Sequence, residues 1–268
     1  MPNTKPVNDS RQVTEYILAK AAEINLVRVH PVAALSKGLA GKTLCGYEDL
    51  KQAGAITVSD DGNPVMNSRL MRSARERVKD LNLPVISHCE DFTLAAGGAM
   101  NEGVVSKKPG IIGTSGVSDS IMVLRHIALS ELTGAPVHIA HVSTAGSVRA
   151  IRDAKARGVR ETVETAPHYF LLTEDVFSKC GSHAKMNPPL GTESDRMAIC
   201  KGLAAGTRYR SRTSFERKEI PRVGLGSKRY YRVGNLSVFE PETGRRRCAA
   251  LAPAGGKDVH QSGRDTRA

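Results

Sequence analysis

The sequence predicts an α/β fold, with a parallel sheet and crossover helices, from three observations. Up to about Gly206, helix-like stretches alternate with short apolar runs, which is the rhythm of consecutive βα units. These segments are short and closely spaced, as in a barrel or a doubly wound sheet. Hydrophobic residues make up 40% and charged residues 25% of the 268 residues, which is ordinary for a chain that buries a sizeable core.

Individual elements follow from the spacing of apolar residues. The expected helices span 11–24, 68–81, 118–133, 146–157 and 194–204. The expected strands span 26–29, 56–58, 84–87, 136–140 and 161–164. Several ends agree with capping chemistry, because Asn82 and Gly134 lie just beyond periodic segments and the Ser143-Thr144 pair precedes another. These signals support the alternation of strands and helices.

Cysteine usage and hydropathy indicate the environment of the protein. The five cysteines are odd in number and lack the CxxC spacing of structural zinc or redox sites. They are Cys45, Cys89, Cys180, Cys200 and Cys248. We therefore expect reduced thiols. The sequence contains neither an apolar run of membrane-spanning length nor a leader-like N-terminus, so we predict no membrane span and a cytoplasmic location.

The net charge of +12 is concentrated at one end of the chain. Residues 208–268 carry 15 Lys and Arg against 6 Asp and Glu, and they include RYRSR, SKRYY and GRRR. No helical or strand period persists there. We therefore predict two regions, a barrel-like domain at 1–206 and a basic tail at 207–268 that is disordered or misfolded. A nucleic-acid arm is the less favoured alternative, because scattered Pro, Gly and Ala are unusual in such arms, and we expect no nucleic-acid partner.

Two predicted strands each deliver a histidine at the carboxyl end. LPVIS runs into His88, and PVHIA runs into His141. In parallel α/β folds this rim collects ligands and catalytic groups. A buried histidine is more often an ordinary core residue, but two at equivalent strand ends make a metal site an equal alternative. His138, inside the second run, is expected to belong to the core or to the shell around the site.

Carboxylates and amides join these histidines at the predicted rim. The run AITVS ends in Asp60-Asp61-Gly62, and two histidines with one carboxylate suit zinc or a similar divalent metal. The same Asp-Gly segment also has the composition of a simple turn. Asn3 and Asn187 lie in proline-stiffened loops, where an amide can hold a carboxylate or an amide ring, or can serve only the turn.

Nine ordered motifs resemble those of one family, the zinc-dependent bacterial-type dihydroorotases of the amidohydrolase superfamily. The match is collinear from Met1 to about Gly206. The motifs are MPNTKP (1–6), KGLAGKTL (37–44), SDDGNPVM (59–66), ISHCED (86–91), MNEG (100–103), VHIAHVSTAGSV (137–148), ETAPHY (164–169), LLTED (171–175) and KMNPPL (185–190).

The resemblance implies a partial (β/α)8 barrel of the TIM type with a binuclear zinc site at the strand ends. Asp61 would be the carboxylate ligand, and His88 and His141 would be imidazole ligands. Asn3 and Asn187 would hold the substrate. The implied activity is the reversible interconversion of dihydroorotate and N-carbamoyl-aspartate in de novo pyrimidine biosynthesis, by zinc-activated water. The implied partners are a second copy of the chain or aspartate transcarbamoylase.

Two other functions remain open at this point. Hydantoinases (dihydropyrimidinases) and allantoinases share the barrel and the metal layout, although they usually bridge their metals with a modified lysine. The DDG, HCED and NPPL segments fit dihydroorotase better. An inactive dihydroorotase-like scaffold for aspartate transcarbamoylase is the second alternative. Such a scaffold tolerates scattered losses among the ligands, whereas Asp61, His88 and His141 all persist here.

Departures from the family pattern predict an impaired enzyme. The family's HxH strand with its arginine belongs before the MPNT motif, where this chain begins. Its Asp-His-Ala-Pro-His segment, whose Asp is the general base, has no counterpart at 208–218. We therefore expect an incomplete barrel, fewer ligands than two zinc ions need, no catalytic base, weak or absent activity and poor solubility. The abrupt change after Gly206 indicates a reading-frame change or a mispredicted gene end.

Overall fold

The computed structural model describes residues 1–95, 97–107, 110–205, 230–233 and 236–239, the last two as backbone only. Its main feature is a five-stranded, all-parallel sheet in the order β1-β2-β3-β6-β7. The strands are β1 (Val32–Ala34), β2 (Thr57–Ser59), β3 (Val85–Ser87), β6 (Val137–Ile139) and β7 (Glu161–Val163). The spatial order follows the chain order without reversing, which is typical of a (β/α) barrel and not of a doubly wound sheet.

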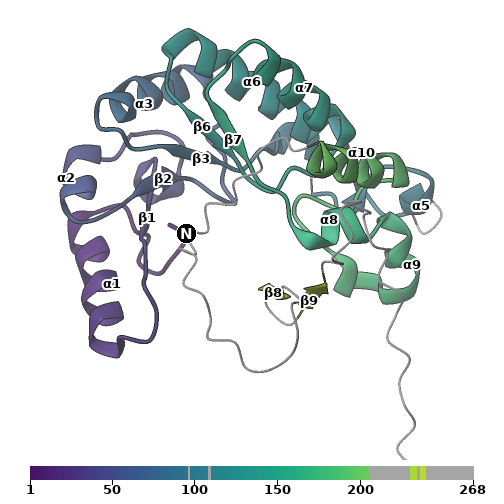
Figure 1. Cartoon of the computed structure of the whole chain (residues 1–268), viewed down its shortest axis with the longest axis horizontal. Helices are drawn as coiled ribbons and strands as arrows, with labels where there is room; N and C mark the ends of the chain where they lie inside the picture. The colour runs from purple at the N-terminus through teal and green to yellow at the C-terminus, as the bar shows by residue number, and fades with distance from the viewer. Residues whose placement is uncertain (96, 108–109, 206–229, 234–235, 240–268) are drawn as a thin grey trace, which may run out of the picture.

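Helices connect these strands and lie along the outside of the curved sheet (Figure 1). The longer helices are α1 (Arg11–Ile24), α2 (Tyr47–Gln52), α3 (Ser68–Asp80), α6 (Val117–Thr133), α7 (Ala145–Ala156) and α10 (Glu193–Ala204). Neighbouring helices pack on one another in the order α3, α6, α7 and α10. The predicted fold class, part of a (β/α)8 barrel, is confirmed by this arrangement.

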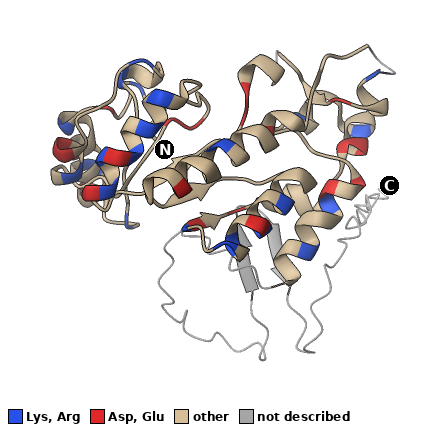
Figure 2. Ribbon diagram, turned by 90° about the horizontal axis from the view of Figure 1, so that it is seen from above, with Lys and Arg blue, Asp and Glu red and all other residues tan. Residues whose placement is uncertain are grey.

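The core lies between the sheet and its helices in two clusters. The first surrounds β1, β2, α2 and α3 and includes Val58 and Leu50, and the second surrounds β6, α6 and α7 and includes Ile139 and Ile151. All four of these side chains are at most 1% exposed. Within the described residues, most Lys, Arg, Asp and Glu positions lie on helices (Figure 2). The burial of β-branched residues on both faces explains why the strands appear in the sequence as continuous apolar runs.

Helix ends follow the predicted capping chemistry. The hydroxyl of Thr144 accepts a hydrogen bond from the backbone N–H of Ser147 and so begins α7. Gly134 ends α6 in the left-handed conformation, with φ 67°, and its N–H bonds to the carbonyl of Ser130. Asn82 also has a positive φ, 48°, just beyond α3. The five predicted helices are confirmed, with ends that differ by at most one residue.

The strand predicted at 26–29 is wrong. That segment is not a strand, and its Leu26 and Val27 side chains are 83% and 72% exposed. The strand lies later in the chain, at β1, where Val32 is paired with Thr57 of β2. The two runs are similarly apolar, but a strand also needs a hydrogen-bonded neighbour. Only the second run meets β2.

Short elements complete the described part of the chain. They are β4 (Met100–Asn101), β5 (Gly113–Thr114), β8 (Tyr230–Val233), β9 (Leu236–Phe239), α4 (Phe92–Ala95), α5 (Val104–Lys107), α8 (Pro167–Leu171), α9 (Phe177–Cys180) and the 3-10 turns Lys37–Leu39, Glu174–Val176 and Gly181–Ala184. The antiparallel pair β8 and β9 lies where no strand period was expected. The rest of the predicted tail lies outside the described residues.

Two further predictions concern the same described ranges. Cys45, Cys89, Cys180 and Cys200 form no disulfide among the described residues, in agreement with the expected reduced thiols, while Cys248 lies outside the described residues. No helix in these ranges is long and apolar enough to cross a bilayer.

Candidate metal centre

The turn after β2 places two neighbouring aspartates in different surroundings. Asp60 is buried, and its carboxylate accepts hydrogen bonds from the backbone N–H of Leu35 at 2.7 Å, the N–H of Ser36 at 3.0 Å and the Ser36 hydroxyl. Gly62 has a φ of 81°, which a side chain would strain. The segment is therefore a turn, as one interpretation predicted. Asp61 lines an open hollow, as the other interpretation requires.

Asp61, His88 and His141 converge at the carboxyl ends of three adjacent strands, β2, β3 and β6. The Nδ1 atom of His88 lies 2.8 Å from the Nε2 atom of His141. The Oδ1 atom of Asp61 lies 3.8 Å from the first nitrogen and 3.7 Å from the second. The structure therefore brings together the three side chains that the sequence placed at one rim.

Glu90 determines how His88 presents its ring. The Nε2 atom of His88 lies 3.0 Å from the Oε2 atom of Glu90. A carboxylate accepts and does not donate, so Nε2 carries the proton and the lone pair of Nδ1 faces the cluster. His141 is held differently, because its Nδ1 is buried without a hydrogen-bond partner in the described structure. Its backbone has a φ of 39°, an unusual left-handed conformation for a non-glycine residue.

The electrostatics of the cluster favour a cation. His141, together with His88, lowers the pKa of the Asp61 carboxyl against the opposing effect of burial. Asp61 is therefore ionised at neutral pH.

Nearby, His138 bonds to Thr162 at 2.8 Å and pairs with Glu164 at 3.4 Å, and it is 8% exposed, as expected for a core or shell residue.

The donor set fits one zinc ion. Two imidazole nitrogens and one carboxylate oxygen are ordinary zinc donors, and three protein ligands leave one position for water. Donors at about 2 Å from a tetrahedral zinc stand roughly 3.3 Å apart, and the three observed separations lie on either side of that value. Two facing imidazole nitrogens 2.8 Å apart must share a proton unless a cation lies beside them. These observations agree with a metal site.

An open hollow of about 280 Å³ borders the three side chains, and Asn187 and Phe92 also line it. The structure therefore brings Asn187 to the cluster. It does not bring Asn3 there, because the exposed Asn3 is absent from the residues that line this hollow.

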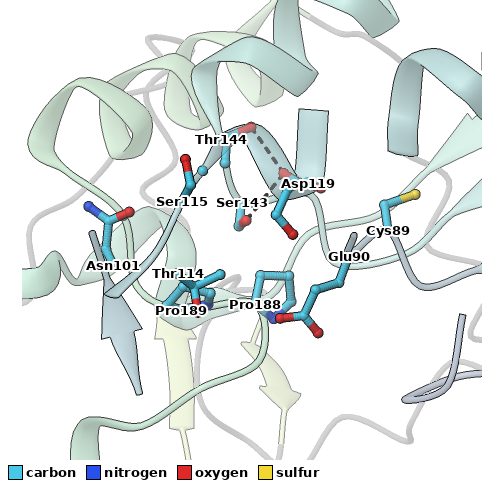
Figure 3. Close-up of a pocket in the computed structure, with 13 residues that line it drawn as sticks. Cys89, Glu90, Asn101, Thr114, Ser115, Asp119, Ser143, Thr144, Pro188 and Pro189 are labelled. Atoms are coloured by element: carbon cyan, nitrogen blue, oxygen red, sulfur yellow. Dashed lines mark hydrogen bonds between the residues drawn. The ribbon is translucent and has the colours of Figure 1, made fainter. Parts of the chain in front are cut away.

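A second, narrow hollow lies beside the first, and Glu90 lines both. Figure 3 shows the residues around this second hollow. Asp119, Ser143 and Thr144 form part of its wall. Sequence reasoning missed the hydrogen bond between His88 and Glu90 and the position of Asp119 in this wall. Glu90 lies two residues after His88, which is a usable signal for proximity, but the direction of its side chain is not visible in the sequence.

Comparison with known proteins places this geometry in a family. A family profile described as "Dihydro-orotase-like" matches residues 1–147. This chain belongs to the dihydroorotase-like family. Similar curated proteins are each named "Dihydroorotase": that of Desulforapulum autotrophicum is 55% identical, and that of Syntrophus aciditrophicus is 54% identical, both over 207 residues. Each match covers 77% of this chain and 49% of the relative. The chain thus spans about half the length of the curated relatives that it matches.

Two solved structures are similar in fold to this chain. The L-hydantoinase (dihydropyrimidinase) of Arthrobacter aurescens matches with a TM-score of 0.63 and 17% identity, over 77% of this chain and 47% of that one. The dihydropyrimidinase of Brevibacillus agri matches with a TM-score of 0.52 and 18% identity, over 70% of this chain and 45% of that one. At these identities the likeness concerns the fold alone.

Proposed function

We propose that this chain supplies the middle of a dihydroorotase active site, which interconverts dihydroorotate and N-carbamoyl-aspartate. The observation that carries the proposal is the convergence of Asp61, His88 and His141 at the edge of one hollow. The relatives named dihydroorotase, at 54–55% identity, favour this reaction over that of the hydantoinases, which resemble the chain in fold.

The proposed metal is zinc. Asp61 would hold it through a carboxylate oxygen, His88 through Nδ1 and His141 through Nε2. Bound zinc polarises a carbonyl oxygen and lowers the pKa of a water ligand to about 7, so that a nucleophile is available at neutral pH. Glu90 keeps the His88 proton on Nε2, which leaves the lone pair of Nδ1 available to bind the metal.

Asn187 is the proposed substrate contact. Its amide lies at the same hollow as the three ligands and offers two donors and one acceptor. A carboxylate or ring amide of dihydroorotate can use these groups, and the hollow of about 280 Å³ is close to the lower end of the volumes usual for small-molecule sites. Asn3, the other predicted contact, is part of the proposal on the family resemblance alone.

The wider role is proposed on the same basis. It includes de novo pyrimidine biosynthesis as the pathway, and a second copy of the chain or aspartate transcarbamoylase as the partner. Because the chain spans about half of its relatives, activity is a property of the whole catalytic unit.

Zinc binding and hydrolysis of dihydroorotate by the purified chain test the proposal together. We expect one zinc per chain, measured by equilibrium dialysis, and weak or absent turnover. Any turnover should disappear in an Asn187→Ala variant with unchanged zinc binding. Circular dichroism establishes that each protein is folded. A folded chain that binds no zinc would contradict the metal centre. Zinc binding with no turnover at any protein concentration would agree with either an incomplete enzyme or a scaffold, and restoring an HxH strand would then separate the two.

A further inference from the structure

The loop that carries His141 from β6 into α7 is tied to helix α6 by one buried carboxylate. Asp119, in the first turn of α6, is 5% exposed. Its Oδ2 atom accepts hydrogen bonds from the hydroxyls of Ser143 at 3.3 Å, Thr144 at 3.0 Å and Ser147 at 3.0 Å. Figure 3 shows the first two of these contacts. One side chain therefore holds three residues that follow His141 closely in the chain.

His141 depends on such support more than His88 does. The ring of His88 is aligned by its hydrogen bond to Glu90, whereas Nδ1 of His141 is buried without a partner in the described structure. The direction of the His141 ring therefore follows from its backbone. That backbone has a φ of 39°, a conformation that persists only where surrounding contacts hold it.

The surrounding contacts come from β7, from α6 and from α10, where the Asp195 carboxylate accepts the Ala145 N–H at 2.8 Å. On the β7 side, the Val142 N–H bonds to the Glu164 carbonyl at 2.8 Å, and the Thr165 hydroxyl bonds to the Val142 carbonyl at 2.7 Å. On the α6 side, Asp119 accepts the hydroxyls of the next two residues. Without Asp119 the loop would keep its bonds to β7 and to Asp195, but the buried hydroxyls of Ser143 and Ser147 would lose their acceptor.

We propose that Asp119 is a positioning residue that orients His141 toward the metal by anchoring Ser143 and Thr144 to helix α6. The inference rests on the metal centre proposed above. Asp119 acts through the loop, and neither metal nor substrate touches it. Groups of this kind behind a metal ligand typically change metal affinity by about 10–100-fold when removed.

Cobalt(II) titration of the full chain tests this role, because the visible absorption of bound cobalt reports the number and geometry of its ligands. We expect Asp119→Ala to weaken cobalt binding by about 10–100-fold and to shift the spectrum toward that of His141→Ala. Asp119→Asn should recover most of the affinity and the spectrum, because its amide oxygen still accepts the hydroxyls.

Ser130→Ala is the matched control. Ser130 is buried in the same helix, and its hydroxyl bonds to the carbonyl of Ala135 at 2.7 Å, away from the His141 loop. The control should therefore lose a buried hydrogen bond without a change in cobalt affinity or spectrum. A folded Asp119→Ala protein with the affinity and spectrum of the unsubstituted chain would overturn the inference.

A second variant covers the case in which Asp119→Ala does not fold. Ser143→Ala combined with Ser147→Ala removes two of the three donors and should produce the same spectral shift with a smaller loss of affinity, whereas unchanged values would overturn the inference. If His141→Ala weakens binding and the Asp119 and serine variants do not, only the positioning role is wrong. A folded chain that binds no cobalt overturns the metal centre and this inference with it.

Discussion

Two histidine clusters lie near the end of β3, and their hydrogen-bonding groups are arranged in opposite ways. At the rim, His88 and His141 turn ring nitrogens toward each other and toward the Asp61 carboxylate. The acceptor atoms face a common space. Such an arrangement is completed by a cation.

The second cluster lies behind β3, where His126 of α6 is fully buried between two arginines. Its Nδ1 lies 2.9 Å from Nη2 of Arg75, and its Nε2 lies 3.2 Å from Nη2 of Arg125. A neutral imidazole has one lone pair, so it can accept from only one of them. The Nε and Nη1 atoms of Arg75 and the Nε atom of Arg125 are buried without partners in the described structure. In this cluster the groups without a hydrogen-bond partner are donors and not acceptors.

The pKa values in the second cluster follow from this arrangement. Burial, with Arg125 nearby, lowers the pKa of Arg75 to about 10, and burial between the arginines lowers that of His126 well below its usual range. His126 therefore stays neutral and cannot neutralise its neighbours. The residue type alone therefore does not decide the role of a buried histidine. The role depends on whether the groups around it supply acceptors or donors.

The largest expected effect is the loss of zinc affinity when a proposed metal ligand is removed. Asp61→Ala leaves two imidazoles without the carboxylate, and we expect zinc affinity to fall by more than the roughly 100-fold that is the upper range for outer groups. Competition with a chromophoric chelator measures the change. His30→Ala, which removes an exposed histidine, is the control and should leave the affinity unchanged. Equal zinc affinity in Asp61→Ala would show that the rim cluster is not a metal site.

A smaller effect is expected for the group that orients His88. Glu90→Ala removes the acceptor of the Nε2 proton, so the ring can turn or change its protonated nitrogen, and zinc affinity should fall by about 10–100-fold. Isothermal titration at constant pH measures it. Glu90→Gln should retain most of the affinity because its amide oxygen still accepts the proton. A similar loss in both variants would point to the charge of Glu90 and not to its hydrogen bond.

The second cluster makes the opposite prediction, a gain of stability. His126→Asp places an anionic acceptor between two buried guanidinium groups, so the free energy of unfolding should rise by about 1–3 kcal/mol. The midpoint of urea unfolding measures this change. His126→Phe, which supplies no acceptor, should lower the midpoint. An Asp variant less stable than the original protein would contradict the proposed surplus of donors.

Glu161 at the start of β7 is an acceptor whose buried oxygens have no donor in the described structure. Both of its carboxylate oxygens are buried without a hydrogen bond in the described structure, and burial raises its pKa to about 7 from the ordinary 4.5. Because the folded state holds the proton more tightly, the stability contributed by the protonated form is full below pH 4.5 and is lost as pH rises through about 7.

Glu161→Gln should therefore stabilise the protein by about 1–2 kcal/mol at pH 8 and by progressively less toward pH 5. Urea unfolding at several pH values measures the difference between the two proteins. Glu131→Gln, which changes an exposed carboxylate nearby, is the control and should show little dependence on pH. A constant difference across this range would mean that Glu161 is ionised in the folded state.

Local patterns predicted most helices and strands correctly, because each depends on a few neighbouring residues. The helix at 11–24 was predicted with the same ends that α1 has. The strand at 26–29 failed because apolar alternation does not say which segment finds a partner. The tie between Asp119 and the His141 loop left no local signal, since its members are 24–28 residues apart.

Sequence patterns alone predicted the order of strands and helices, the caps at Thr144 and Gly134, and the position of Asp61, His88 and His141 at one rim. These features depend on local periodicity and on the shared direction of parallel strands. Tertiary structure decided that Asp60 is held by Leu35 and Ser36, that Asp119 is bonded to the His141 loop, and that Asn187 lines the hollow while Asn3 does not. Those outcomes depend on distances between segments far apart in the chain, which no local pattern contains.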